Sequence, residues 1–310
     1  MGYVPRIMMT LRALMERFPS DEDCKQFLFR RRWPKAVTCP RCGTSDHVYA
    51  LDTRPWHWEC AGKKCRKGNA YRFSIISGTV FENTKYPLKV WFEVLWQMLN
   101  SKKGVSAKQI QRQIGSGSYQ TAWYMCHRLR AAMEDPDFQK LMGIVEVDET
   151  YIGGKAKNRH GGLQGKGMKG KHRGGRGPLG KVPVIGAIAR KGNVVCQMLD
   201  YVDGVTLKDF VRQTVSDKVE LIATDQHSGY AGLKYMGYRH EKVDHSCGEY
   251  VRGEVHTANL DSFWALLKRG IVGTYHNVSA KYLPLYLAEF QFRHNNRKNP
   301  DIFGAAIAGC

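Results

Sequence analysis

Two apolar runs end on an aspartate, Ile144-Val145-Glu146-Val147-Asp148 and Leu221-Ile222-Ala223-Thr224-Asp225, and they decide the fold of this chain. Short apolar runs of this kind are typical of buried strands. A third acid, Asp261, lies in a helical stretch, and Lys268 follows seven residues later, which places both on one face of the expected helix.

Further strand and helix patterns surround these runs. We expect strands at 182–189, 194–199, 220–224 and 239–243, a hairpin turn at 190–193, and helices at 206–216, 257–268 and 282–295. Three antiparallel strands, a helix, and then a strand with an acid at its tip form the order of a ribonuclease-H-like domain. The predicted fold class is therefore α/β.

Carboxylates that come together from distant segments suit metal-dependent phosphoryl transfer. Two divalent cations can hold the attacking and leaving oxygens of a phosphodiester, and Mg²⁺ prefers oxygen ligands. The roles of two neighbouring acids, Glu146 and Glu149, are less certain from their positions in the sequence. Glu146 shares a strand face with Asp148 and is expected either to assist or to be exposed. Glu149 is expected to form a salt bridge, and Trp264 to pack its helix against the core.

Composition points to a polyanionic partner. The chain has 310 residues, 43% of them hydrophobic, and a formal net charge of +20. Basic domains gain affinity for nucleic acid by releasing counterions, so nucleic acid is the expected partner. No run of 18 or more apolar residues occurs, so no membrane span is expected. The odd count of nine cysteines does not suit a secreted disulfide framework and favours a reducing cytoplasm.

Four of the cysteines follow the spacing of a metal site. Cys39 and Cys42 form a CxxC knuckle followed by Gly43, and Cys60 and Cys65 form a looser CxxxxC pair. Four thiolates around a tetrahedral Zn²⁺ explain this pattern, and the metal would supply the folding energy of so small a ribbon. His47 and His57 are the alternative ligands if one cysteine is out of reach.

The segment between this ribbon and residue 140 is predicted to be helical. A strongly apolar helix follows Pro87, a second begins after Ser106 as its N-cap, and a third runs from about Ser118. A helix, a short turn and a helix form the DNA-reading helix-turn-helix layout. Arg128 and Arg130 on the last helix are the expected DNA contacts.

A basic, glycine-rich insert covers residues 155–181. It holds nine Lys and Arg residues and no acid, so it cannot bury a core and is expected to be a flexible arm. The side chains expected to contact the DNA backbone are Lys166, Lys169, Lys171, Arg173 and Arg176.

The expected organisation has five parts. They are a helical lead at 1–36, a zinc ribbon at 37–80, a helix-turn-helix-like DNA-binding region at 81–140, a catalytic domain at 141–300 and a tail at 301–310.

Taken together, these motifs resemble a known family. The chain is similar to the bacterial insertion-sequence DDE transposases of the ISXO-type group, which carry a zinc ribbon ahead of a ribonuclease-H-like catalytic domain. The stretches that carry the resemblance are Val145–Lys155, Thr224–Tyr230, Asp261–His276 and Glu289–Asn295, and with the ribbon they span nearly the whole chain.

The resemblance implies metal-dependent strand cleavage and strand transfer at the ends of an insertion sequence. Asp148 and Asp225 match the first two catalytic acids. The third position is expected at Asp261, where the family usually has Glu, with Asn259 as the alternative because some members use an Asn. Mg²⁺ or Mn²⁺ would be held by the three acids, and Lys268 would hold DNA near them.

The resemblance also implies partners and leaves two rival functions. The expected partners are the double-stranded DNA of the terminal inverted repeats and target DNA, handled by a homodimer or a higher assembly in the cytoplasm, at the nucleoid when bound to DNA. One rival is a catalytically inactive DNA-binding protein derived from a transposase. The other is a ribonuclease-H-type nuclease that cuts without joining.

Overall fold

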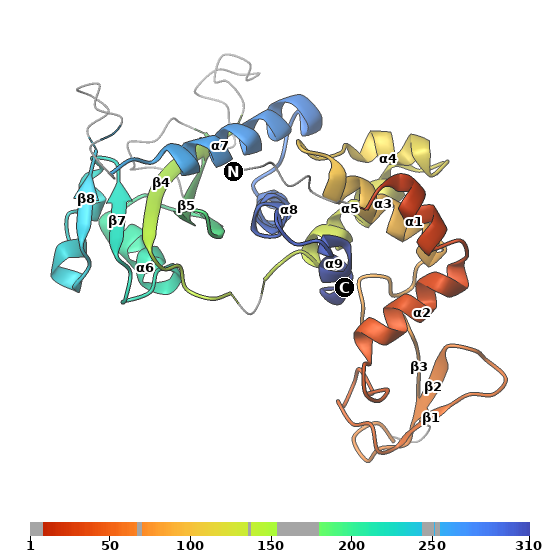
Figure 1. Cartoon of the computed structure of the whole chain (residues 1–310). Helices are drawn as coiled ribbons and strands as arrows, with labels where there is room; N and C mark the ends of the chain where they lie inside the picture. Colours follow the sequence, from red (N-terminus) through yellow and green to blue (C-terminus); the bar gives the residue numbers. More distant parts are fainter. Residues whose placement is uncertain (1–8, 67–69, 136–137, 154–179, 244–250, 252–254) are drawn as a thin grey trace. The chain divides into compact units, whose positions relative to one another are not determined.

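The computed structural model describes residues 9–66, 70–135, 138–153, 180–243, 251 and 255–310. These residues form two compact units (Figure 1): Met1–Glu134 with Lys298–Cys310, and Asp135–Arg297. Within the described ranges, no helix is long and apolar enough to cross a membrane.

The first unit joins a small sheet to a set of helices. Its helices are α1 (Leu11–Arg17), α2 (Asp21–Arg32), α3 (Leu88–Asn100), α4 (Ala107–Gln113), α5 (Tyr119–Ala131) and α9 (Ile302–Ala308), and its strands are β1 (Val48–Ala50), β2 (His57–Cys60) and β3 (Tyr71–Ser74). A complete capping box on Ser20 and Asp23 starts α2, and the Ser106 side chain caps α4 by accepting from Gln109 N at 3.2 Å. Ser106 is thus the N-cap that the sequence predicts.

The small sheet is an antiparallel meander in the order β1-β2-β3. The sequence predicts short strands at 47–51 and 56–60, which correspond to β1 and β2, whereas β3 was not expected. Its Phe73 lies opposite Trp58, and both rings pack with Trp33 at the end of α2. Aromatic packing therefore attaches this sheet to the helices of its own unit.

The last residues differ from the expected tail. They form α9, whose Phe303 packs against the rings of Phe18, Phe27 and Phe92. Arg31 also pairs with Asp301, the residue before the helix. The end of the chain is therefore part of the core of the first unit, because an apolar helix this short gains stability only by packing.

The second unit is a five-stranded sheet with helices on both faces. Its elements are β4 (Ile144–Ile152), β5 (Val182–Ala189), β6 (Val194–Met198), α6 (Gly204–Thr214), β7 (Leu221–Thr224), β8 (His240–Lys242), α7 (Ala258–Gly270) and α8 (Leu283–Asn295). The strand order is β6-β5-β4-β7-β8, with β4 antiparallel to β5 and parallel to β7. This order confirms the ribonuclease-H-like prediction.

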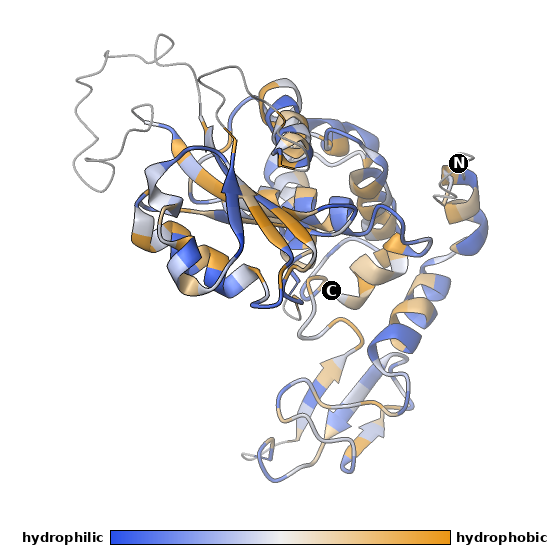
Figure 2. Cartoon of the chain, turned by 60° about the vertical axis from the view of Figure 1, so that its left-hand side comes forward, coloured by the Kyte–Doolittle hydropathy of each residue, from blue (hydrophilic) through white to orange (hydrophobic). Residues whose placement is uncertain are grey.

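Alternation along β4 separates the two faces of the sheet. Val145 and Val147 belong to a core with α6, while α7 and α8 cover the other face with a second core around Trp264 and Leu287. Figure 2 shows hydrophobic residues along the central strands. Because side chains alternate along a strand, Glu146 and Asp148 point to the face that α7 covers.

Candidate functional site

Parallel pairing of β4 with β7 brings Asp148 and Asp225 together. Val147 of β4 lies opposite Thr224 of β7, so the next residues, Asp148 within β4 and Asp225 directly after β7, are neighbours, although β4 continues past Asp148 to Ile152. Asp225 Oδ1 also accepts a hydrogen bond from His227 N at 2.9 Å, which closes the turn after β7. The catalytic pair expected from the sequence is therefore adjacent in space.

Glu149 joins this pair and completes a cluster of acids. One carboxylate oxygen from each of Asp148, Glu149 and Asp225 lies within 4.8 Å of the others, close enough to share a metal ion. Among the described residues Glu149 has no salt-bridge partner, and its side chain instead accepts a hydrogen bond from the Tyr230 hydroxyl. An acid directly after Asp148 was the sequence signal for this role.

Burial and mutual repulsion weaken the acidity of the cluster. Burial, and then the charges of Asp225 and Asp261, raise the pKa of Asp148 to about 7. Burial likewise raises the pKa of Glu149 to about 8, against the lowering effect of the Tyr230 hydrogen bond. A bound divalent cation would offset both the repulsion between these acids and the cost of ionising them in a buried place. The raised pKa values therefore favour cation binding at this cluster.

Trp264 orients Asp148 from α7. Its Nε1 donates to Asp148 Oδ2 at 3.1 Å, and the ring is 3% exposed in the core that covers β5. The expected packing role of Trp264 is confirmed, and the hydrogen bond adds a contact to the site. Gly186, opposite Asp148 on β5, leaves the space for this ring.

The Gly186→Ala substitution tests this arrangement. An added Cβ would lie 2.6 Å from Trp264 Cζ2, so the ring would have to move away from Asp148. We expect the substitution to lower the free energy of unfolding by about 1–3 kcal/mol and to weaken metal binding. Urea denaturation checks the stability, and Gly273→Ala, whose Cβ meets open space, is the control in the same unit. Equal stability of the two variants would contradict this role of the glycine.

The acid cluster also predicts a pH dependence of stability. The raised pKa values mean that the folded protein binds more protons than the unfolded chain, whose carboxyl groups titrate near pH 4. Without a divalent cation, the contribution of these two carboxyl groups to stability should be fully present below about pH 4 and should be lost as the pH rises through about 7 to 8. Mn²⁺ should therefore raise the Tm more at about pH 8 than at about pH 5.5. Thermal unfolding with and without Mn²⁺ measures this difference, and an equal Tm shift at both pH values would contradict it.

Asp261 and Lys268 lie on α7, where the sequence places them, and both side chains are exposed. Asp261 Oδ2 accepts from Thr257 Oγ1 at 3.2 Å, and its charge contributes to the raised pKa of Asp148. Asn259 is placed differently, since its Nδ2 donates to Glu146 Oε1 at 2.7 Å. Glu146 is fully buried and paired with Arg190, so the expectation of an exposed side chain is wrong.

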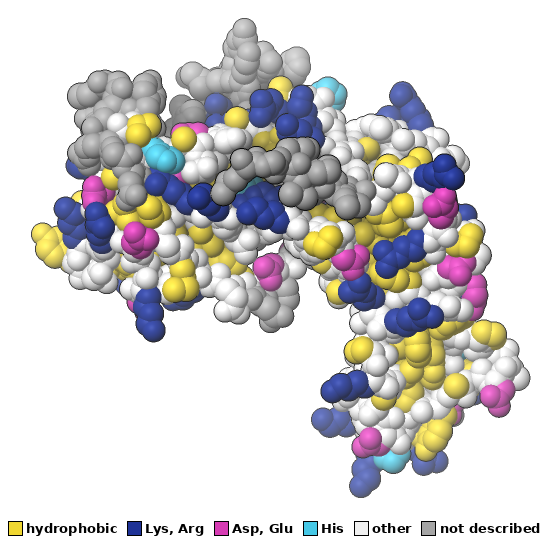
Figure 3. Space-filling view, in the orientation of Figure 1, with side chains coloured by type: hydrophobic (Ala, Val, Ile, Leu, Met, Phe, Trp, Pro, Cys, Tyr) yellow, Lys and Arg dark blue, Asp and Glu magenta, His cyan; other side chains and the backbone are white. Residues whose placement is uncertain are grey.

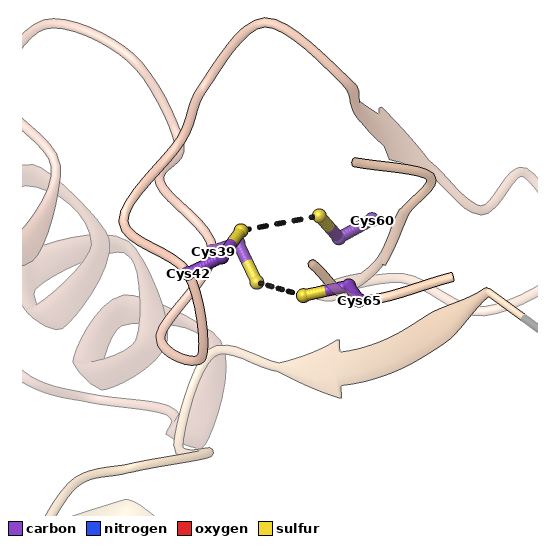
Figure 4. A group of neighbouring side chains, drawn as sticks. All are labelled: Cys39, Cys42, Cys60 and Cys65. Atoms are coloured by element: carbon purple, nitrogen blue, oxygen red, sulfur yellow. Dashed lines mark hydrogen bonds between the residues drawn. The ribbon is translucent and has the colours of Figure 1, made fainter. Parts of the chain in front are cut away.

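The four cysteines of the ribbon converge in the same way (Figure 4). Cys39 Sγ lies 3.6 Å from Cys65 Sγ, and Cys42 Sγ lies 3.7 Å from Cys60 Sγ. Tetrahedral zinc with bonds of about 2.3 Å to sulfur requires a sulfur separation of roughly 3.8 Å, so this donor set fits the metal. Within the described ranges, the two histidine alternatives are not part of this cluster.

The knuckle geometry explains how the cysteines reach one point. Gly43 adopts a φ of +75°, and its N–H donates to Cys39 O at 2.8 Å. On the other side, Cys65 N donates to Gly62 O at 2.8 Å, which turns the longer loop back to the site. Glycine permits the first turn because side chains disfavour the left-handed region.

The predicted DNA contacts divide into two groups. Lys166, Lys169, Lys171, Arg173 and Arg176, with most of the 155–181 insert, lie outside the described residues. Arg130 is 2% exposed, which corrects its expected role as a surface contact, because the inward face of α5 buries it. Arg128 Nη2 donates to Glu82 O at 2.7 Å. Lys and Arg side chains are nevertheless spread over both units on the face in Figure 3.

A sheet of this order, with acids on β4 beside an acid directly after β7, defines a ribonuclease-H-like domain with a candidate metal site. Comparison with known proteins places it more closely: the ISXO2-like transposase domain matches residues 140–295, and the transposase zinc-ribbon domain matches residues 19–68. The chain belongs to the ISXO2-like transposase family.

Two individual proteins show similarity to the chain. A protein in transposable element ISH50 of Halobacterium salinarum is 26% identical over 295 residues, which cover 92% of this chain and 95% of the relative. A chain of the pre-cleavage Mos1 transpososome crystal structure aligns with 14% identity and a TM-score of 0.27, over 70% of this chain and 78% of its own length.

Proposed function

We propose that this protein is a DNA transposase that binds the ends of an insertion sequence and catalyses metal-dependent strand cleavage and strand transfer. One observation carries the proposal: Asp148 within β4 lies beside Asp225 directly after the neighbouring strand β7 of a ribonuclease-H-like sheet, in a chain of the ISXO2-like family. The strongly basic composition suits a nucleic-acid substrate.

The proposed ligands of the catalytic cations are Asp148, Asp225 and Asp261. Bound Mg²⁺ or Mn²⁺ would supply Lewis-acid activation at a phosphodiester. Trp264 donates a hydrogen bond to the carboxylate of Asp148, which is half-buried. Lys268, which is exposed on α7, would bind a DNA phosphate in this proposal.

The proposed DNA-binding surface lies mainly in the first unit. The ribbon, held together by Zn²⁺, and the helices α4 and α5 would recognise the terminal inverted repeats. Tyr119 and Tyr124 are 47% and 58% exposed on α5 and are better placed for contact than the buried Arg130. The basic insert would contact the DNA backbone, and two copies or more would hold two ends together at the nucleoid, in the cytoplasm.

Cleavage followed by joining is the test of this function. We expect the full-length protein with Mn²⁺ or Mg²⁺ to cut DNA that carries the element's own ends and to join the new 3′ end to target DNA. Cutting without joining would favour the ribonuclease-H-type nuclease. Specific binding to the ends without cutting would favour the inactive DNA-binding relative of a transposase.

A further inference from the structure

A buried carboxylate of β4 contacts the helix that carries the proposed third ligand. Glu146 is 0% exposed and precedes Asp148 by two residues on the same face of the sheet. Burying a carboxylate is costly unless charges and hydrogen bonds compensate it. The groups that contact Glu146 therefore explain why β4 has a buried acid between Val145 and Val147.

The partners of Glu146 belong mainly to the first turn of α7. Glu146 Oε2 accepts from the backbone N–H groups of Asn259 and Leu260 at 2.9 and 3.2 Å. The residue at the usual capping position, Thr257, makes no side-chain hydrogen bond to these groups. Glu146 thus caps the helix from the neighbouring strand, and its negative charge suits the helix N-terminus.

The other oxygen of Glu146 ties further groups to this end of α7. Oε1 accepts from Asn259 Nδ2 at 2.7 Å and from Arg190 Nε at 3.0 Å, and His256 Nδ1 lies 3.2 Å away. Arg190 Nη2 in turn donates to His256 O at 3.4 Å. The contact therefore joins β4, the β5–β6 turn and the start of α7.

We propose that Glu146 is a positioning residue that holds the start of α7 against β4, so that Asp261 and Trp264 face Asp148, and that Asn259 belongs to this contact and is not a metal ligand. The inference rests on the proposed function, since it concerns the same metal site. β4 then holds α7 at two points on one face, through Glu146 at its N-terminus and through Asp148 at Trp264. Loss of the first contact would free the first turn, where Asp261 lies.

The Glu146→Gln substitution tests the positioning role. Loss of a residue that orients metal ligands lowers metal affinity by roughly 10- to 100-fold, and we expect a loss of this size in Mn²⁺ affinity by calorimetry. The turnover number for DNA cleavage should fall, while DNA-end binding without metal should be unchanged. The matched control is Asp203→Asn, which weakens the N-cap of α6 in the same unit. If both variants lose stability but bind Mn²⁺ like the wild type, Glu146 is only structural and the proposal fails.

Substitutions of Asn259 give a sharper test, because its two possible roles predict opposite rankings of the Mn²⁺ affinities of Asn259→Asp and Asn259→Ala. An aspartate in place of a metal-binding asparagine would still bind metal, so Asn259→Asp would retain more Mn²⁺ affinity than Asn259→Ala. In the contact with Glu146, an aspartate would place two carboxylates together, so Asn259→Asp should be the weaker of the two. The double variant Glu146→Gln with Asn259→Asp should then recover part of the lost affinity. Tighter Mn²⁺ binding by Asn259→Asp than by Asn259→Ala would overturn the proposal. Weaker binding by Asn259→Asp, with recovery in the double variant, would support it.

The contact between Glu146 and Asn259 can also be tested if the proposed function itself fails. If the wild type neither binds Mn²⁺ nor cuts DNA, thermal unfolding of Glu146→Gln, Asn259→Ala and their combination still reports on the contact. Losses of Tm that do not add indicate a shared interaction. Additive losses would refute it.

Discussion

Asparagine in place of Asp148 or Asp225 is expected to lower the rate of metal-dependent DNA cleavage by roughly a thousandfold, which corresponds to about 4 kcal/mol of transition-state stabilisation. The amide keeps the size of the side chain but removes the charge that would hold a divalent cation. In the absence of metal the Asp148→Asn variant should be at least as stable as the wild type at about pH 8, because burial and the charges of Asp225 and Asp261 disfavour the ionised acid.

Single-turnover cleavage of DNA that carries the element's ends measures the effect, and thermal unfolding shows that the fold is retained. The control is Asp209→Asn, an acid of α6 that pairs with Arg212 on the surface. Wild-type cleavage by either folded site variant would remove that aspartate from the proposed site. A similar loss in Glu149→Gln would make Glu149 a further ligand, as its place in the cluster allows.

Serine in place of Cys39 is expected to abolish tight zinc binding and to unfold the ribbon. Structural zinc sites bind their metal with about 10–16 kcal/mol, and the three short strands of this sheet cannot replace that energy with their own core. The aromatic contacts of Trp58 and Phe73 with Trp33 should be lost with the ribbon, and so should affinity for the transposon ends.

Metal analysis of the purified protein gives the zinc content, and protease digestion locates the unfolded segment. The matched control is Cys24→Ala, which alters a fully buried cysteine of α2 outside the cluster. We expect the control to retain one zinc ion per chain and to bind DNA normally. Full zinc content in Cys39→Ser would mean that the site does not require this thiolate.

The sequence alone predicted the features that depend on local patterns. Apolar runs marked β4 and β7, each followed by an aspartate in the sequence, and the pairing of β4 with β7 brings Asp148 and Asp225 together as expected of catalytic carboxylates. Cysteine spacing predicted the ribbon cluster for the same reason, since two short loops determine where the thiolates point. The choice between Asp261 and Asn259 stays a prediction, to be decided by the substitutions above.

Only the tertiary structure decided which polar side chains are buried and what they contact. Period-two alternation placed Glu146 on the face of Asp148 but could not show that α7 covers it. Helical periodicity likewise did not show that Arg130 points inward, or that the apolar end of the chain packs as α9 against the rings of the first unit. Local patterns determine secondary structure and the spacing of nearby ligands, whereas burial and hydrogen bonding depend on which distant segment packs against each face.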